Sequence, residues 1–467
     1  MEIISLNFVI FTSFSLVVYH LLPSRLKSFW LLGISVVFYF LFSIRFALVL
    51  SLLVLINFYL GKKAFQSNNK NLVWIPLLLN ICSFIFIKIF SREFIFEIIK
   101  TEEIIGSKML LPIGFSYYML QLISFQLDIR NKKFLEFPLI RDFSLYLFYF
   151  PKLLSGPIEK PRAFLAKLAN PRIVDNALFS RALNMILLGL IRKLFIANIL
   201  QSLLPFWNDQ PELIGWIQAL CFVLYVYNDF AGYTLIVCGV SNLFGIELSP
   251  NFLNPLLARN FSEFWTRWHI TLSAWLRENI YYPVSRRLNR NSGKTVEIIA
   301  AFVIPPLVTM LASGFWHNAS SALLLWGTIL GLFMIVERLM FESFPQTRKW
   351  SQKGLGRAIA SSMVFLAYSF AMIPLASNSV MTTFTIWKNM LTGMDLINNS
   401  VFLPVIGLGS FSFLLDVLAE LKGKQIWWED LALIPRSAIV ATGIMILVIS
   451  ILLIAFLPSK VFIYQGF

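Results

Sequence analysis

The chain has 467 residues, of which 58% are hydrophobic and 13% are charged, and its mean hydropathy is +0.75. Soluble domains are nearer to half apolar and a quarter charged, so this composition excludes an ordinary soluble protein and predicts a polytopic membrane protein. The net charge of +15 would suggest nucleic-acid binding in a soluble protein. Here we expect no nucleic-acid partner, because Lys and Arg accumulate in the cytoplasmic loops of membrane proteins.

The cysteines and the N-terminal run give no sign of a disulfide framework, a metal site or a cleavable signal peptide. Cys82, Cys221 and Cys238 lie in apolar runs and form neither a disulfide framework nor a metal-ligand spacing. The apolar run after Met1 lacks a basic flank before it and a small-residue cleavage site after it. Since a cleavable signal peptide has both, we expect this run to remain as the first span.

Apolar runs of about 20 residues predict membrane-spanning helices. The first four are 3–22, 29–42, 46–60 and 72–90, the second and third being short. Basic residues gather in the first loop, at Arg25 and Lys27, and in the third, at Lys62, Lys63 and Lys70. By the positive-inside bias, these loops are cytoplasmic and the N-terminus is extracytoplasmic.

The middle of the chain is less regular. The run 110–125 is interrupted by Pro112 and Gly114, which predicts a re-entrant or tilted element. A short apolar run at 143–154 and a turn at 155–158 precede 159–172, an amphipathic surface segment.

Further spans are predicted along the rest of the chain, at 182–204, 213–240, 296–312, 320–336, 358–375, 402–421 and 434–457. The fold class is therefore an all-α polytopic membrane protein with about ten to twelve spans, without an internal repeat or a soluble domain. We divide its single transmembrane domain, 1–467, into N-terminal spans at 1–109, a motif-bearing core at 110–340 and C-terminal spans at 341–467.

Two stretches carry unusual polarity. Residues 263–283 contain three tryptophans, His269 and four charged side chains, and ionisable residues that persist at membrane depth usually mark a site. Apolar residues from Trp265 to Leu276 recur at spacings of three and four, which predicts one helix with a single apolar face. His317 follows Trp316 between two apolar runs, in a break that should line a cavity.

The remaining polar candidates can also be explained by structural roles. Asp229 is the most conspicuous acid within a predicted span, and it is either a site residue or a hydrogen-bonded structural acid. His20, near the end of the first span, is interpreted as an interfacial packing residue.

His269 and His317 are better explained together, as lining one site. Burial lowers the pKa of an imidazole and keeps it able to accept a proton, so it can deprotonate a hydroxyl that attacks an acyl carbonyl. The sequence has no GxSxG elbow, no cysteine beside a histidine, no P-loop and no dinucleotide fingerprint, and its two histidines make a poor zinc site. We therefore expect direct acyl transfer with a histidine base, no metal and no bound cofactor.

Motifs along most of the chain resemble those of the membrane-bound O-acyltransferase family, especially its bacterial branch of alginate and peptidoglycan O-acetyltransferases. They are Leu111-Pro112-Ile113-Gly114-Phe115-Ser116-Tyr117-Tyr118, Phe150-Pro151, Ser155-Gly156-Pro157-Ile158, Asp229-Phe230-Ala231-Gly232-Tyr233, Asn251-Phe252-Leu253-Asn254-Pro255, 263–283, Gly314-Phe315-Trp316-His317 and Trp326-Gly327.

The resemblance implies a helical bundle around an intramembrane tunnel, with His317 catalytic and His269 orienting the reactants. It implies further substrate-binding or tunnel-shaping residues, namely Trp268, Trp316, Arg277, Asp229, Asn318 and Tyr281. It also implies a cytoplasmic donor such as acetyl-CoA or another acyl thioester and an extracytoplasmic glycan acceptor. A second membrane-anchored or periplasmic acyltransferase is the implied partner, in the bacterial cytoplasmic membrane.

The sequence departs from the family pattern at three places. Asn318 follows the catalytic histidine where the family usually has Gly, Leu330-Gly331 stands where a His-Gly pair is common, and Phe370-Ala371-Met372-Ile373 replaces an aromatic-Arg-Ala motif. These departures bear on the donor and the acceptor more than on the reaction.

Two other functions stay open. D-alanyl transfer to teichoic acid from a carrier-protein thioester belongs to a related branch, whereas a proton-coupled transporter or flippase would use the histidines as a relay. If the donor is acetyl-CoA, a basic entrance would attract its phosphates, and Arg267, Arg286 and Arg287 are candidates for that rim. Ordinary anchoring of a cytoplasmic loop is the alternative role for each of these arginines.

Overall fold

The structure is a computed structural model that describes residues 3–67, 70–90, 114–204, 207, 209, 211, 214–289, 295–392 and 399–454. These residues contain helices and no strand, and ten of the helices are long and apolar enough to cross a membrane. The predicted all-α polytopic fold is confirmed. Residues 110–113 of the interrupted run, residue 213 and the end of the last predicted span, 455–457, lie outside the described residues.

The second and third spans are longer than predicted. They are α2 (Ser24–Phe42) and α3 (Ile44–Gln66), and each takes basic residues into its helix: Arg25 and Lys27 in α2, Lys62 and Lys63 in α3. Long basic side chains at a helix end can reach the membrane interface, so the helix continues beyond its apolar run. The basic residues therefore indicated where the apolar run ends, and the helix continues past that point.

Contacts divide the chain into two compact units. The first comprises residues 1–186, 233–249 and 463–467, and the second comprises 187–232 and 250–462. The helices of the first unit are α1 (Leu6–Leu21), α2, α3, α4 (Trp74–Phe90), α6 (Phe115–Arg130), α7 (Ile140–Phe148), α8 (Phe150–Leu153), α9 (Pro161–Ala169), most of α10 (Asn176–Leu190) and the end of α12 (Trp216–Leu243), with a 3₁₀ turn, η1 (Lys70–Val73).

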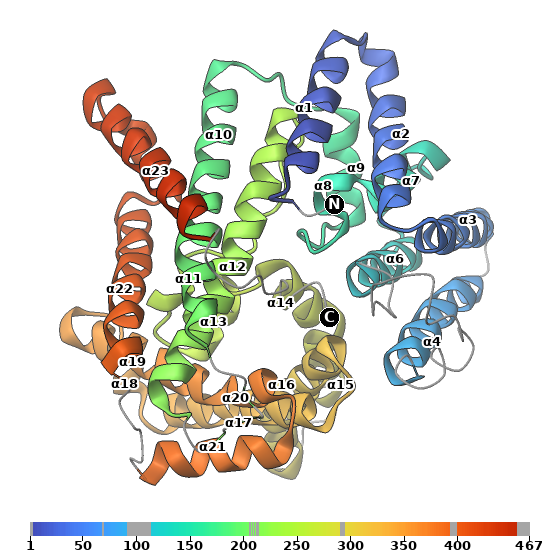
Figure 1. Ribbon diagram of the computed structural model, residues 1–467. Coiled ribbons are helices and arrows are strands. Elements are labelled where there is room, and N and C mark those ends of the chain that lie inside the picture. Colours follow the sequence, from blue (N-terminus) through green and yellow to red (C-terminus); the bar gives the residue numbers. More distant parts are fainter. Residues whose placement is uncertain are drawn as a thin grey trace. The chain divides into compact units, whose positions relative to one another are not determined.

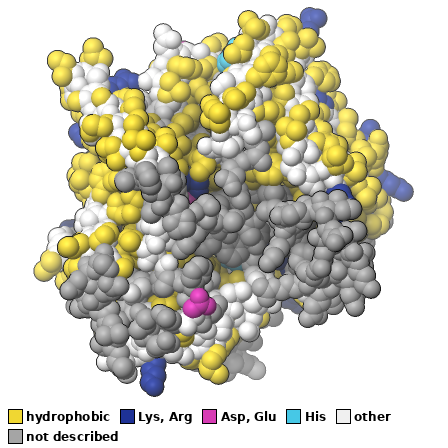
Figure 2. Space-filling model, in the orientation of Figure 1, with side chains coloured by type: hydrophobic (Ala, Val, Ile, Leu, Met, Phe, Trp, Pro, Cys, Tyr) yellow, Lys and Arg dark blue, Asp and Glu magenta, His cyan; other side chains and the backbone are white. Residues whose placement is uncertain are grey.

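Apolar side chains cover the outside of the first helices. On α1, Leu6 and Phe14 are 72% and 61% exposed, whereas Phe8 and Tyr19 are buried. Figure 2 shows hydrophobic side chains spread over much of the described surface, with few charged ones among them. Large exposed apolar side chains are expected where a helix faces lipid instead of water. His20 donates from Nε2 to the carbonyl of Leu243 at 2.9 Å, in keeping with a packing role.

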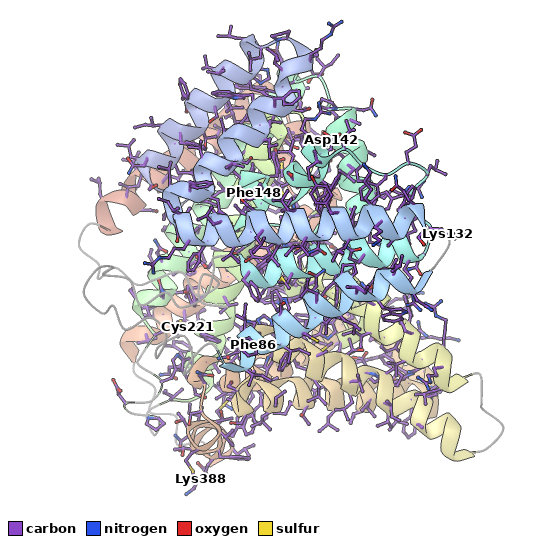
Figure 3. All side chains as sticks on the ribbon, turned by 90° about the vertical axis from the view of Figure 1, so that its right-hand side faces the viewer. Phe86, Lys132, Asp142, Phe148, Cys221 and Lys388 are labelled. Carbon is purple, nitrogen blue, oxygen red and sulfur yellow. The ribbon has the colours of Figure 1, made fainter. Side chains whose placement is uncertain are left out.

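Helices α3, α4 and α6 lie side by side (Figure 3) and are joined by buried amides. Asn57 and Asn80 exchange side-chain hydrogen bonds of 3.0 and 2.7 Å, and Gln126 donates to Asn57 Oδ1 at 2.9 Å. Such bonds between helices stabilise membrane bundles, in which apolar burial gives little preference for one neighbour over another.

The interrupted run becomes a helix that starts at the break. Gly114 has φ of 76°, and α6 begins at the next residue and runs for 16 residues. A side chain at Gly114 would meet the carbonyl oxygen of Leu153 at 2.3 Å, so only glycine fits there. Nearly every residue of α6 is buried, which agrees with an element enclosed by protein rather than a lipid-facing span.

The second unit holds both motif histidines. Its elements are η2 (Ile191–Ala197), α11 (Asn198–Ser202), most of α12, η4 (Pro255–Leu257), α13 (Phe261–Arg267), α14 (Ile270–Leu276), η5 (Arg277–Tyr281), α15 (Tyr282–Asn289), α16 (Thr295–His317), α17 (Ser321–Ser343), α18 (Pro345–Trp350), α19 (Gly354–Ala371), α20 (Ile373–Ser377), α21 (Val380–Thr392), α22 (Asn399–Lys422), η6 (Trp427–Asp430) and α23 (Leu433–Ile454) (Figure 1). Both η2 and η5 are π-helical.

The helices α16 and α17 form a hairpin and lie side by side (Figure 1). A Cβ at Gly314 would come within 2.2 Å of Leu323 O, and one at Gly327 within 2.3 Å of Met310 O. Two glycines therefore let the backbones approach closely, as small residues do in membrane helix pairs. The first helix runs on to His317, so this histidine ends a helix and the break is confined to residues 318–320.

The prediction of one helix from Trp265 to Leu276 is wrong. Helix α13 ends at Arg267, and α14 starts at Ile270. Asn251 accepts hydrogen bonds from the first two backbone N–H groups of α14. Its carbonyl accepts from Ile270 N at 2.9 Å, and its Oδ1 accepts from Thr271 N at 3.2 Å. These tertiary hydrogen bonds outweigh the helical periodicity and place His269 in the left-handed region, with φ of 41°.

Candidate active site

The backbone break positions His269. This residue immediately precedes α14, its carbonyl accepts from Ser273 N at 2.9 Å, and its side chain is 2% exposed. Burial lowers the pKa of His269 to about 3, since a charged imidazole would lose its hydration. His269 is therefore neutral at physiological pH. A left-handed conformation in a residue other than glycine is uncommon and is often found where a site requires it.

His317 is held by the two helices of the hairpin. It is the last residue of α16, is 5% exposed, and contacts two tryptophan rings. Its ring centroid is 4.7 Å from that of Trp316 and 5.3 Å from that of Trp326 on α17. The close approach of the two helices brings Trp326 to this distance.

Trp316 brings the two histidines together. Its ring centroid lies 5.9 Å from that of His269 and 4.7 Å from that of His317, so both imidazoles pack against one indole. Phe230 of α12 covers His269 from another direction, at 4.8 Å between centroids. The two histidines, 48 positions apart in sequence, thus belong to one cluster.

A second aromatic group surrounds Trp268, the residue before His269. Its ring lies 5.2 Å from Phe252, stacks on Phe264 at 5.5 Å, and lies 5.1 Å from Tyr368 of α19, centroid to centroid. Trp268 is therefore a core side chain that fixes the break. Its packing supports a positioning role in place of direct contact with a substrate.

Asp229 has a charged partner. It accepts from Lys193 Nζ, and both side chains are almost completely buried. Gly232, one turn further along α12, permits this pairing because a Cβ there would lie 2.6 Å from Gly189 O and 2.9 Å from Lys193 N. Asp229 is thus an ion-paired acid inside a span, and Phe230 next to it contacts His269.

A second buried ion pair lies next to the first, and sequence reasoning missed it. Arg192 Nη2 donates to Asp416 Oδ1 at 2.7 Å, and Arg192 Nη1 donates to Asn228 Oδ1 at 3.0 Å. Tyr227 donates to Asp416 at 2.8 Å, which joins the pair to α12. The signal was available: Arg192, Lys193 and Asp416 are charges inside predicted spans. The π-helical turn that carries both basic residues is a type of distortion frequent at functional sites.

The other predicted site residues lie at the ends of these elements. Arg277 donates from Nη2 to Trp265 O at 3.4 Å, and Tyr281 OH accepts from Arg338 Nη1 at 3.3 Å. Asn318 donates its backbone N–H to Gly314 O at 3.1 Å, directly after His317. These contacts place Asn318 beside His317 in the chain and give Arg277 and Tyr281 structural partners.

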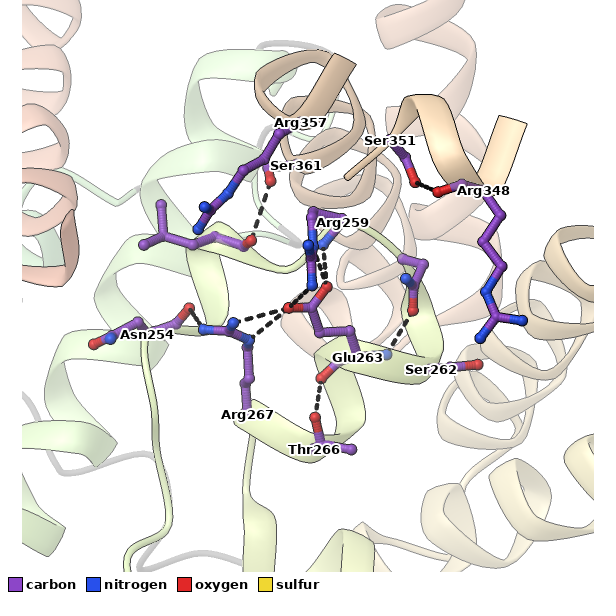
Figure 4. A network of polar contacts seen from close by, with 12 residues as sticks. Asn254, Arg259, Ser262, Glu263, Thr266, Arg267, Arg348, Ser351, Arg357 and Ser361 are labelled. Carbon is purple, nitrogen blue, oxygen red and sulfur yellow. Dashed lines mark hydrogen bonds and ion pairs between the residues drawn. The ribbon is translucent and has the colours of Figure 1, made fainter. Parts of the chain in front are cut away.

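Arg267, a candidate for a phosphate-binding rim, is instead part of an ion network (Figure 4). It donates to Glu263 at 2.8 Å and to Glu420 at 2.9 Å, and Arg259 pairs with Glu263 from the other side at 2.8 Å. Burial acts to raise the pKa of Glu263, but hydrogen bonds from Arg259 and the charges of both arginines outweigh it and hold that pKa below its usual range. Arg286 and Arg287 remain exposed.

Comparison with known proteins identifies the family. The model of the membrane-bound O-acyltransferase family matches residues 31–377, which include both histidines and the rings of Phe230, Trp316 and Trp326 described above. The chain belongs to the membrane-bound O-acyltransferase family. Its family membership, together with O-acetyltransferases among its relatives, identifies it as an acyltransferase, and the transporter hypothesis is set aside.

Relatives of this acyltransferase are named for different polymers. A probable alginate O-acetylase of Azotobacter vinelandii is 28% identical over 70% of this chain and 67% of its own length. A peptidoglycan O-acetyltransferase of Helicobacter pylori is 25% identical over 73% of this chain and 70% of its own length. A teichoic acid D-alanyltransferase of Streptococcus thermophilus is 28% identical over 64% of this chain and 73% of its own length.

Proposed function

We propose that this acyltransferase moves an acyl group, most simply acetyl, from a cytoplasmic thioester towards a hydroxyl of an extracytoplasmic envelope polysaccharide. The observation that carries the proposal is the pair of buried imidazoles on Trp316. A base next to a second polar ring, enclosed by aromatic side chains, suits a proton transfer that must exclude water. The alginate and peptidoglycan O-acetyltransferase relatives support the choice of acetyl and of a polysaccharide.

The two histidines take different parts. A general base works best when its pKa lies near the operating pH. His317 ends the motif Gly314-Phe315-Trp316-His317, whose histidine is the catalytic one by resemblance to the family, and this supports His317 as the base. Burial lowers the pKa of His269, which supports a neutral ring that orients the reactants. His317 accepts the proton of the acceptor hydroxyl while that oxygen attacks the thioester carbonyl.

The reaction balances without a cofactor. A carbon–oxygen bond forms, the carbon–sulfur bond of the thioester breaks, and the leaving thiolate takes the proton from the imidazolium of His317. The products are the ester and a free thiol. The acyl thioester, such as acetyl-CoA, is a substrate, and a neutral His317 is regenerated.

The cellular setting is part of the proposal. A cytoplasmic donor and an extracytoplasmic acceptor require a chain in the bacterial cytoplasmic membrane, with its basic loops inside and its N-terminus outside. We also propose a second membrane-anchored or periplasmic acyltransferase as the partner that completes delivery to the polysaccharide. Arg286 and Arg287, exposed on α15, are the candidate residues for attracting the phosphates of the donor.

D-alanyl transfer is the second candidate. It is favoured by the 28% identity to the S. thermophilus teichoic acid D-alanyltransferase, and it would use the same histidine chemistry on an aminoacyl thioester. The two candidates differ in the donor and in the acyl group transferred.

Transfer assays with vesicles test the proposal. Vesicles that contain the full chain, its proposed partner and the acceptor polysaccharide are supplied with labelled acetyl-CoA or with D-alanyl thioester of a carrier protein, and label in polysaccharide esters is measured. We expect acetyl transfer by the wild type and a loss of about 100-fold or more in His317→Ala, the scale of general-base catalysis. Normal rates in a folded His317→Ala protein would remove its assigned role, and D-alanyl transfer without acetyl transfer would select the second candidate.

A further inference from the structure

A cavity of about 840 Å³ lies within the second unit, apart from the histidine cluster. Its walls come from α12, η4, α19 and α22 and are mostly apolar, including Leu224, Leu257, Phe365, Val405 and Phe413. Neither motif histidine nor any tryptophan lines it. A volume of this size is typical of a pocket for an organic ligand.

The cavity is open towards the lipid-facing side of two membrane helices. Both α19 and α22 contain candidate spans. On α22, Ile406 and Phe413 line the cavity and are each 46% exposed, so they belong both to its wall and to the outer surface of the helix. Hydrocarbon can therefore enter between the two spans. Apolar walls alone would not select a ligand in a bilayer, because lipid tails are as apolar as the side chains.

Selectivity comes from the polar end, which Arg357 and Glu420 line. Glu420 accepts two hydrogen bonds from Arg267, at 2.9 and 3.0 Å, and another from Asn254 at 3.2 Å. Arg357 makes a longer contact of 3.3 Å with Glu420, and its side chain is 44% exposed. A guanidinium has five N–H donors, so Arg357 can bind an anion while it keeps this contact.

The surrounding charge favours an anion. Arg259, Arg267 and Arg357 outnumber Glu263 and Glu420 in the network at this end of the cavity. Lys353 and Lys422, which adjoin the lining residues Gly354 and Leu421 in sequence, are also exposed. An excess of positive charge beside an apolar space fits an amphiphile with a negative head group.

We propose that this cavity binds one anionic phospholipid of the bilayer, with an acyl chain between α19 and α22 and its phosphate on Arg357. The proposal concerns a resident lipid rather than a reactant, so it is independent of which acyl group the enzyme transfers. Bound lipid would fill the space between α19 and α22, and its phosphate would contact the ion network that includes Arg267.

Two glycines of α22 give a matched test of the apolar part. A Cβ at Gly409 would point at Leu224 Cδ1, 2.9 Å away, whereas a Cβ at Gly407 has nothing within 4 Å. Native mass spectrometry of the full chain is used to follow retention of phosphatidylglycerol. We expect one bound molecule in the wild type and in Gly407→Leu, and at least a tenfold loss in Gly409→Leu. Ser362→Phe fills the cavity from α19 if Gly409→Leu does not fold.

Two arginines test the polar part. Arg357→Gln should reduce the preference for phosphatidylglycerol over phosphatidylcholine by about tenfold, the size expected from one hydrogen bond to a charged group. Arg348→Gln, which changes an exposed arginine of α18 that does not line the cavity, should leave the preference intact. Equal binding of the two lipids by the wild type, retention in the cavity-filling variants, or an equal effect of both arginine variants would overturn the proposal.

Discussion

At the scale of single residues, His269 shows how a backbone decides the chemistry of a side chain. Asn251 occupies the hydrogen bonds at the break, His269 takes a left-handed conformation, and the imidazole enters an aromatic cluster beside Phe230 and Trp316. Burial then makes its protonation costly. The result is a neutral ring, which suits an orienting role better than that of a base.

This burial predicts a dependence of stability on pH. The pKa of His269 is lowered from 6.5 to about 3, so between these values the unfolded chain binds the additional proton. The stabilisation is therefore fully present above pH 6.5 and is lost as the pH falls towards 3. His269→Gln lacks this titration, and its melting temperature should fall less than that of the wild type between pH 7 and about pH 5.

Thermal unfolding in detergent, followed by circular dichroism, measures this difference. Above pH 7 the curves of melting temperature against pH should run parallel for the two proteins. Parallel curves across the acidic range as well would show that His269 is accessible to water and would contradict the buried position of its ring.

At the scale of elements, the approach of α16 and α17 sets the position of His317. The backbone contact at Gly314 lies one turn before the histidine. Gly314→Ala would place a methyl group 2.2 Å from Leu323 O and force the helices apart. We expect a loss of about 1–3 kcal/mol in stability, as for other overpacked sites. We also expect the rate of acetyl transfer per folded molecule to fall, because His317 is displaced.

Gly407→Ala is the control, because an added methyl group there meets nothing within 4 Å. Melting temperatures and acetyl transfer are compared for the two variants. Wild-type stability and activity in Gly314→Ala would show that the hairpin tolerates a wider separation than the structure indicates.

The ion pair of Arg192 and Asp416 joins η2 to α22 in the apolar interior. Asp416→Leu leaves Arg192 buried without its carboxylate, which should cost about 3–5 kcal/mol. Arg192→Met combined with Asp416→Leu removes both charges, and it should recover part of that loss. A double variant that is destabilised by the sum of its two single variants, measured by thermal unfolding, would contradict a direct pairing of these charges.

The elements also show what the sequence could predict. Apolar runs predicted most of the spans, although the first run, 3–22, forms only the 16-residue α1, which is shorter than the ten candidate spans. The Trp-His motifs predicted that both histidines belong to one cluster, because polar rings are unusual between apolar runs. The break at Trp268 and His269 could not be predicted from periodicity, since hydrogen bonds from Asn251 impose it. Arg192 and Asp416 are 224 residues apart in the sequence, and only the fold brings them together. Their charges within spans were visible, but their pairing was not.

At the scale of the whole molecule, ten candidate spans and family membership describe a multi-pass membrane acyltransferase. The relatives of this chain are named for alginate, for peptidoglycan and for teichoic acid, so similarity alone does not select the polymer. The family match supports acyl transfer, and the acceptor has to be identified in the cell.

The central claim is that His317 catalyses acylation of an envelope polysaccharide. Mass spectrometry of envelope polysaccharides from cells with the wild-type chain, without the chain, and with His317→Ala at equal membrane abundance tests it most directly. The account predicts ester-linked acetyl groups with the wild type and background levels in the other two. Ester levels that do not change when the chain is absent, or that His317→Ala restores fully, would contradict it.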